Sequence, residues 1–202
     1  AALLVPVRSL LAELPRRFRI DRTRVHLLEP VIEPRCLEGP DLRTRWGLGP
    51  MHRLVGITAR IQPHRRFELL WQVARAVTAV VPEARFVLLG RGNEADTKAL
   101  VTDPVQALGL APFVVLPGYL QEPDYSAALR SLDAFLFLVP GSDGTCRAVR
   151  EAMAQGLPVV STQRGILPEL LAPVRTGEVP GAAVPETVEA MATALMGLLQ
   201  IG

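Results

Sequence analysis

The stretch from residue 54 to residue 89 reads LVGITARIQPHRRFELLWQVARAVTAVVPEARFVLL, and it decides the fold class. Residues 54–58 are a short apolar run, which predicts a buried strand. Between residues 67 and 80 the apolar side chains recur at helical spacing, and residues 85–89 form a second short apolar run. A strand, a helix and another strand in this order predict a parallel βαβ unit.

The alternation of strands and helices continues toward the end of the chain. Further strands are predicted over 113–116, 134–139 and 158–161, and further helices over 94–108, 124–132, 148–155, 167–171 and 185–199, the last with Pro185 in its first turn. Gly156 is expected to close the helix before it in a left-handed conformation. The predicted fold class is therefore α/β, with a Rossmann-like parallel sheet covered by helices on both faces. Such sheets bind ligands at the carboxyl ends of their strands.

Residues 1–53 have a different, irregular pattern. Only residues 9–14 look helical, and prolines at positions 15, 30, 34, 40 and 50 interrupt regular structure. We interpret residues 1–53 as a leader or interdomain connection, and residues 54–202 as one Rossmann-like domain.

The composition excludes several classes of protein. The chain has 202 residues, of which 49% are hydrophobic and 21% charged, as expected for a folded globular domain. The net charge is only +2 and no five-residue block of like charge occurs, so nucleic-acid binding is not indicated. Cys36 and Cys146 are far apart, which argues against a metal site or disulfide framework and favours a reducing compartment. Because no apolar run could span a membrane, a cytoplasmic location is expected.

Cations follow the first predicted strand. Arg60 and Arg65 lie in the segment ARIQPHRR (59–66), at the carboxyl end of the strand and just before a helix. Helix amides and an arginine fork both favour a phosphate there. The alternative is an ordinary charged surface loop.

Glycines follow the second predicted strand, in the segment GRGN (90–93). No third glycine stands at the dinucleotide-binding spacing, and no acidic residue ends the next strand. A nicotinamide cofactor is therefore disfavoured, and a tight turn is a better interpretation than a ligand contact.

The segment PGSDGTCRAVRE (140–151) after the fourth predicted strand is the most informative loop. Asp143 lies in the turn and Glu151 in the following helix, while Gly144, Thr145 and Cys146 offer amides at the helix start. Two carboxylates on either side of an anion-binding turn suit a ligand with hydroxyls at both ends and a phosphate between them, such as a nucleotide-sugar. The structural alternatives are that Asp143 is a helix cap and that Glu151 is an exposed helix residue.

Three blocks of this sequence occur in a recognisable order. They are GITAR (56–60) with Pro63, Arg65 and FELL (67–70); FVLLGRG (86–92) with the turn at Gly118; and residues 143–160, continuing through STQRG (161–165) to Pro168 and Glu169. Together they resemble the C-terminal, donor-binding domain of retaining GT-B glycosyltransferases, in particular glycosyltransferase family 4. The resemblance covers the chain from about residue 54 to its end, which makes this the expected nucleotide-sugar-binding domain.

The resemblance implies a role for each matching residue. Arg60 and Arg65 would hold the donor diphosphate and offset charge on the departing nucleotide, and Asp143 would touch the transferred sugar. Glu151 would bind the ribose hydroxyls, with Gly144, Thr145 and Cys146 on the phosphates. The base would rest on the turn from Gly118 to Leu120.

The same resemblance implies the reaction and its partners. The donor would be a UDP- or GDP-sugar, no metal would be required because no DxD pair occurs, and transfer would retain configuration. In that family the acceptor pocket belongs to a preceding domain, which residues 1–53 are too short to form. The chain is therefore expected to lack its acceptor domain and to be inactive alone.

Several positions depart from the family pattern. Asp143 replaces the usual glutamate, Thr145 and Cys146 replace Phe-Gly, Arg65 replaces lysine, and Arg66 stands where glycine is usual. Arg66 would either crowd the diphosphate or add a contact. These departures leave open a degenerate GT-B-like binding or interaction module without transferase activity. A GT-B epimerase or phosphorylase relative is a third alternative. The phosphorylase would need a pyridoxal lysine, and the only lysine, Lys98, falls in a predicted helix away from the site.

Overall fold

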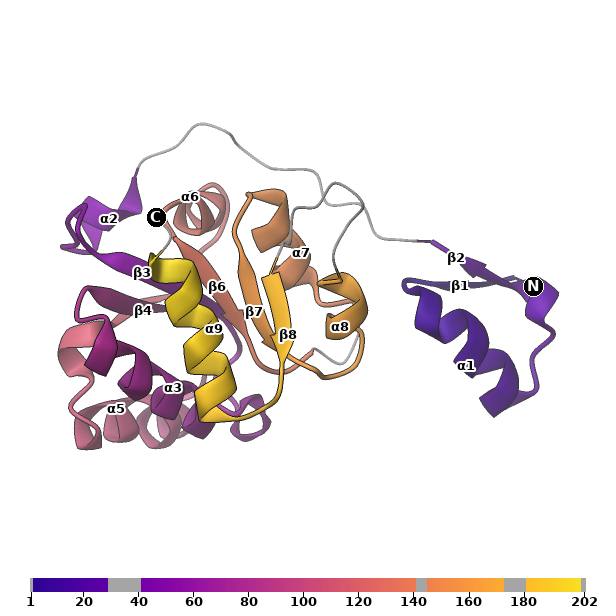
Figure 1. Ribbon diagram of the computed structural model, residues 1–202, viewed down its shortest axis with the longest axis horizontal. Coiled ribbons are helices and arrows are strands. Elements are labelled where there is room, and N and C mark those ends of the chain that lie inside the picture. Colours follow the sequence, from indigo (N-terminus) through magenta and orange to yellow (C-terminus); the bar gives the residue numbers. More distant parts are fainter. Residues whose placement is uncertain (1, 29–40, 141–144, 173–180, 201–202) are drawn as a thin grey trace.

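The computed structural model describes residues 2–28, 41–140, 145–172 and 181–200 (Figure 1). A small N-terminal unit consists of β1 (Leu3–Val5), α1 (Arg8–Phe18), the 3-10 turn η1 (Arg22–Arg24) and β2 (Val25–Leu27). The larger part consists of α2 (Leu42–Arg45), β3 (Arg53–Thr58), η2 (Pro63–Arg65), α3 (Phe67–Val80), β4 (Ala84–Leu89), α4 (Glu94–Thr97), the π-helical turn η3 (Lys98–Thr102), α5 (Asp103–Ala107), η4 (Ala111–Phe113), β5 (Val114–Gly118), α6 (Asp124–Arg130), β6 (Ala134–Phe137), α7 (Arg147–Ala154), β7 (Val159–Thr162), α8 (Leu167–Leu170), β8 (Gly181–Val184) and α9 (Val188–Gln200).

The larger part is built on a six-stranded parallel sheet in the order β5-β4-β3-β6-β7-β8. In the centre, Val55 of β3 lies opposite Phe86 of β4 on one side and Ala134 of β6 on the other. The chain winds outward from β3 in one direction and then from β6 in the other. This doubly wound order confirms the predicted fold class and opens a crevice at the carboxyl ends of β3 and β6.

Side chains alternate between two cores, one on each face of the sheet. Along β4, Phe86 and Leu88 pack with helices α3 and α9, whereas Val87 and Leu89 pack with α6 and α7. These strand residues are almost fully buried. Burial on both faces explains why the strands read as continuous apolar runs in the sequence.

Some predicted elements differ from the observed ones. The last predicted helix begins at Val188 instead of residue 185, because β8 comes before it and pairs with β7. The single helix predicted over 94–108 is interrupted by the π-helical turn η3. Gly156 follows α7 with a φ of 77°, which confirms its predicted left-handed conformation. Among the helices of the described ranges, none has the length and apolar character that a membrane span needs.

The prediction of irregular structure was wrong for residues 2–28, although the helix predicted over 9–14 is confirmed as part of α1. β1 and β2 pair in parallel, and α1 connects them. The sequence suggested irregular structure because the strands are short and prolines are frequent. Pro15 is accommodated inside α1. The small unit lies beyond α8 along the long axis (Figure 1), and Val7 packs in the same core as Leu42.

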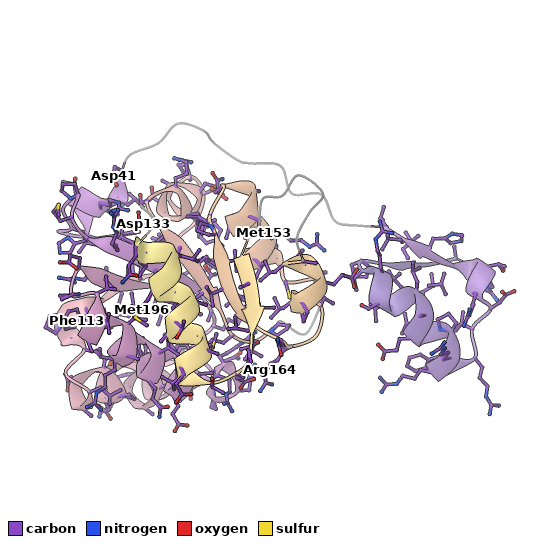
Figure 2. The ribbon with its side chains drawn as sticks, in the orientation of Figure 1. Asp41, Phe113, Asp133, Met153, Arg164 and Met196 are labelled. Atoms are coloured by element: carbon purple, nitrogen blue, oxygen red, sulfur yellow. The ribbon has the colours of Figure 1, made fainter. Side chains whose placement is uncertain are left out.

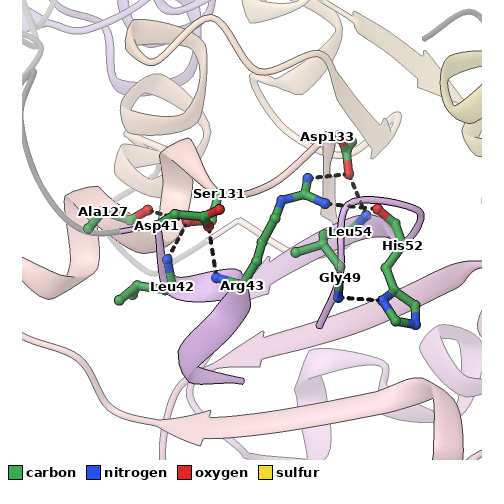
Figure 3. A network of polar contacts seen from close by, with 9 residues as sticks. All are labelled: Asp41, Leu42, Arg43, Gly49, His52, Leu54, Ala127, Ser131 and Asp133. Carbon is green, nitrogen blue, oxygen red and sulfur yellow. Dashed lines mark hydrogen bonds and ion pairs between the residues drawn. The ribbon is translucent and has the colours of Figure 1, made fainter. Parts of the chain in front are cut away.

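A polar network joins residues 41–53 to the large sheet (Figure 3). One carboxylate oxygen of Asp133, which precedes β6, accepts from the Leu54 amide at 2.6 Å and from Arg43 Nη2 at 2.7 Å. Arg43 Nη1 also donates to the carbonyl of His52 at 2.8 Å, and the Leu42 amide donates to the buried Ser131 hydroxyl at 3.1 Å. Residues 41–53 are therefore attached to the amino ends of the central strands.

Replacing Asp133 by alanine is expected to destabilise the fold by about 2 kcal/mol, because a buried amide and a largely buried guanidinium lose their acceptor. The measurement is the free energy of unfolding in urea. Asp103→Ala is the matched control, because Asp103 pairs with Lys98 on the exposed surface, where such pairs contribute little. Equal losses for the two variants would contradict the role given to Asp133.

Glu169 of α8 caps the first turn of α1. Its two carboxylate oxygens accept from the amides of Arg8 at 2.6 Å and Ser9 at 3.0 Å. Such amides have no partner within their own helix. Partial burial by itself raises the pKa of Glu169, but the hydrogen bonds from Ser9 and Arg8 outweigh it and lower that pKa. The carboxylate thereby links the small unit to the large sheet.

Glu169→Gln is expected to reduce the hydrogen-exchange protection of the Arg8 and Ser9 amides. Because the folded-state pKa is lowered, the contribution of Glu169 is present above the ordinary carboxyl pKa and is lost as pH falls through the lowered value. Protection in the unmodified protein should therefore decline in acid. Glu13→Gln, on the exposed face of α1, is the control. Unchanged protection in Glu169→Gln would show that the contact is not maintained in solution.

Candidate functional site

Two adjoining cavities lie at the carboxyl ends of the central strands. Their volumes are about 660 and 530 Å³, in the range of small-molecule sites. Both cavities are lined by Thr58, Arg60, Leu89, Tyr119, Arg147 and Ala148. They therefore form one continuous region over β3, β4 and the start of α7, at the point where the strand order reverses.

The first cavity contains both predicted phosphate-binding cations. Arg60 is exposed at its edge, and Arg65 is half-buried. Arg65 Nη1 donates to the carbonyls of Val139 at 3.1 Å and Pro140 at 3.4 Å, which ties the loop after β3 to the end of β6. Its Nε is buried and has no hydrogen-bond partner among the described residues. A partly buried guanidinium that lines a cavity favours an anionic ligand there.

Arg66 does not line either cavity. It has a φ of 62°, in the left-handed region where glycine is usual, and its Nη2 lies 2.9 Å from Glu186 Oε1. Arg164, which follows β7, donates to the same oxygen at 2.8 Å. The hydrogen bond from Arg164 lowers the pKa of Glu186. Figure 2 shows Arg164 and Asp133 at opposite ends of the sheet, so this ion-pair cluster lies at the ligand-binding edge.

The loop of residues 90–93, for which the sequence favours a tight turn over a ligand contact, also lines the first cavity. A side chain at Gly90 would meet the carbonyl oxygen of Ala59 at 1.9 Å, so glycine allows the loops after β3 and β4 to approach closely. Arg91 stacks on the exposed ring of Tyr119, with 4.6 Å between the guanidinium carbon and the ring centroid. This pair forms one wall of the region.

Glu151 lies in the second cavity and is held on both oxygens. Oε1 accepts from Arg147 Nε at 2.7 Å, and Oε2 accepts from the Tyr125 hydroxyl at 3.1 Å. The Glu151 side chain is only 19% exposed, which excludes the interpretation of an exposed helix residue. Leu120, from the predicted base-binding turn, lines the same cavity.

The other predicted residues are placed less uniformly. Cys146 is buried, lines the first cavity and precedes α7 with a φ of 50°. Thr145 lines neither cavity, and its carbonyl accepts from Arg150 Nε. Gly118 also lines neither, but its φ of 82° forms the turn, and its carbonyl accepts from the Gly90 amide. Asp143 and Gly144, like Cys36, lie outside the described residues.

Arg147 and Tyr125 are among the lining residues that the sequence interpretation missed, and Tyr119 was included only as part of a predicted turn. Arg147 precedes Glu151 by four positions, and this spacing of opposite charges on a helix could have indicated the ion pair. Tyr119 follows Gly118 in the predicted base-binding turn. Tyr125 lies 26 positions before Glu151, and no local pattern relates the two.

A doubly wound parallel sheet, with cations and a largely buried carboxylate at its switch point, is the architecture of a Rossmann-like domain. The family model of glycosyl transferases group 1 matches residues 52–200. The chain therefore belongs to this family, and its fold is that of the C-terminal half of a GT-B glycosyltransferase.

Curated relatives are similar over much of this chain. A GDP-mannose-dependent alpha-mannosyltransferase of Mycolicibacterium smegmatis is 34% identical over 125 residues, which cover 61% of this chain and 29% of the relative. The sulfoquinovosyl transferase SQD2 of Arabidopsis thaliana is 32% identical over 162 residues, covering 79% and 29%. The chain thus spans about three tenths of the length of these relatives.

Solved structures share the fold. HepE of Anabaena, in complex with UDP and glucose, superposes with a TM-score of 0.76 at 18% identity and covers 98% of this chain and 53% of that one. The C-terminal domain of the group 1 glycosyl transferase LpcC from Francisella tularensis gives 0.60 at 22% identity, covering 73% and 75%. At these identities the likeness concerns the fold.

Proposed function

We propose that the chain is the donor-binding domain of a retaining, family 4 type glycosyltransferase and binds a nucleotide-diphosphate sugar. The observation that carries this proposal is that Arg60 and Arg65 line a cavity that continues into the one lined by Glu151. One region therefore contains a cation that can bind a phosphate, Arg65, and a carboxylate that can accept hydrogen bonds from hydroxyl groups, Glu151. A nucleoside diphosphate carries both groups.

The proposed pose follows the lining residues. The diphosphate lies between Arg60 and Arg65, and the ribose hydroxyls bind Glu151. The base rests near Leu120, beside the pair formed by Arg91 and Tyr119. The contact of the transferred sugar with Asp143 stays a prediction from the family resemblance.

The cations also suit a transfer step. Breaking the bond between sugar and diphosphate leaves negative charge on the departing phosphate, and Arg60 and Arg65 would stabilise it without a metal ion. The relatives whose names give a donor use GDP-mannose, and HepE binds UDP, so a GDP- or UDP-sugar is the proposed donor class. The acceptor would bind to a part of the parent protein outside this chain. The 202-residue chain alone would therefore be inactive.

Calorimetric titration of the 202-residue chain with UDP, GDP and ADP, and with their sugars, tests the proposal. We expect one of the nucleotides to bind in the presence of EDTA with 1:1 stoichiometry. A folded protein that binds none of them would overturn the proposed function.

The second candidate is a GT-B-like binding module without transferase activity. Cys146 and Arg66, both in left-handed conformations where the family has glycine, favour it because they mark a departure at the site. Turnover by the full-length parent protein, with retention seen by NMR of the product and with loss of turnover in Asp143→Ala and Glu151→Ala, would exclude this candidate.

A further inference from the structure

Tyr125 reaches the second cavity from α6, and nothing in the proposed function accounts for it. Its hydroxyl lies 3.1 Å from Glu151 Oε2 and 3.5 Å from Thr58 Oγ1. Thr58 ends β3, Tyr125 lies in the first turn of α6, and Glu151 lies in α7. Three elements that are distant in sequence thus meet at this one hydroxyl.

The donor and the acceptor in each hydrogen bond of the Tyr125 hydroxyl can be assigned. A carboxylate paired with an arginine accepts hydrogen bonds only, so the Tyr125 hydroxyl must donate to Glu151. Its single proton is then used, and Thr58 must donate to the tyrosine oxygen. Burial raises the pKa of Tyr125, and although the hydrogen bond from Thr58 opposes this, the negative charge of Glu151 raises it further. The hydroxyl therefore stays a donor across the physiological range of pH.

Arg147 and Tyr125 leave some lone pairs of the Glu151 carboxylate available to a ligand. Arg147 occupies one lone pair of Oε1, and Tyr125 occupies one lone pair of Oε2. Within the described ranges these are the donors to the carboxylate, so one lone pair remains on each oxygen, which matches two neighbouring hydroxyl groups. The Arg147 side chain is 68% exposed, so solvent weakens its ion pair with Glu151, which lies on the same helix. Tyr125 is the better shielded of the two donors.

We propose that Tyr125, oriented by Thr58, is a positioning residue that fixes the Glu151 carboxylate to receive both hydroxyls of a ribose. This inference rests on the proposed function, because it takes the ligand to be a nucleotide. Tyr125 acts through Glu151 and does not itself bind the ribose.

The test compares Tyr125→Phe with the unmodified chain against GDP and 2′,3′-dideoxy-GDP, and against the UDP pair if UDP binds more tightly. Without Tyr125 the Glu151 carboxylate is no longer held in place and hydrogen-bonds the ribose less well. Because a hydrogen bond to a charged group is worth about tenfold in affinity or more, GDP binding is expected to weaken about tenfold. Affinity for the dideoxy nucleotide should stay unchanged, because it has no ribose hydroxyls for Glu151 to hold. Thr58→Val should give the same pattern with a smaller loss.

Tyr119→Phe is the matched control, since it removes the same atom from the other tyrosine of the region. Its effect, whatever its size, should be the same factor for GDP and dideoxy-GDP. If Tyr125→Phe weakens both nucleotides equally, or weakens neither, the positioning role is overturned while the proposed function stands. If the unmodified chain binds neither GDP nor UDP, the proposed function itself fails and this inference fails with it.

Discussion

Arg65→Met is expected to weaken the binding of a nucleoside diphosphate by between tenfold and a hundredfold, because a charge-assisted hydrogen bond is worth about 1.5–3 kcal/mol. Arg65 lines the first cavity, so its guanidinium would lie against the ligand phosphate. Calorimetry with GDP or UDP measures the loss. Affinity for the corresponding nucleoside, which has no phosphate, should stay unchanged.

Two controls separate binding from folding in this prediction. Arg75→Met removes an exposed arginine from α3 and should leave the affinity unchanged. Because Arg65 also holds the carbonyls of Val139 and Pro140, the urea midpoint of Arg65→Met shows whether the variant is folded. A folded Arg65→Met variant with undiminished affinity would remove Arg65 from the site.

Glu151→Ala is expected to weaken nucleotide binding tenfold or more, because the ribose hydroxyls lose a charged acceptor worth about 1.5–3 kcal/mol. The loss should disappear for a 2′,3′-dideoxy nucleotide. Calorimetry on both nucleotides measures it. Glu189→Ala, an exposed change in the first turn of α9, is the matched control. An equal loss of affinity for both nucleotides would mean that Glu151 maintains the fold of the site and does not bind the ribose.

Much of the fold could be predicted because its signal is local. β3 and β4 were predicted to within one residue at each end, since strands buried on both faces are apolar throughout. β8 was missed because its residues, GAAV, carry small side chains, and the strand is defined by backbone pairing with β7. β1 and β2 are three residues long, too short for any periodicity to show.

The candidate site was predicted where it follows from the order of the strands. Arg60, Arg65 and Glu151 come after β3 and β6, and the carboxyl ends of these strands meet at one edge of the sheet. Tyr125 could not be predicted in the same way, because its approach to Glu151 depends on how α6 packs against α7. The ion pair of Arg66 with Glu186 likewise depends on β8, which the sequence did not reveal.

Hydrogen exchange of the chain with and without saturating nucleotide tests the central claim most directly, because it locates the ligand. We expect added protection in residues 59–66, 90–93, 118–122 and 145–151, which surround the two cavities, and none in β1, α1 or β2. Binding that leaves these four segments unchanged, or that protects only the small N-terminal unit, would contradict the placement of a nucleotide-sugar site at the carboxyl ends of the central strands.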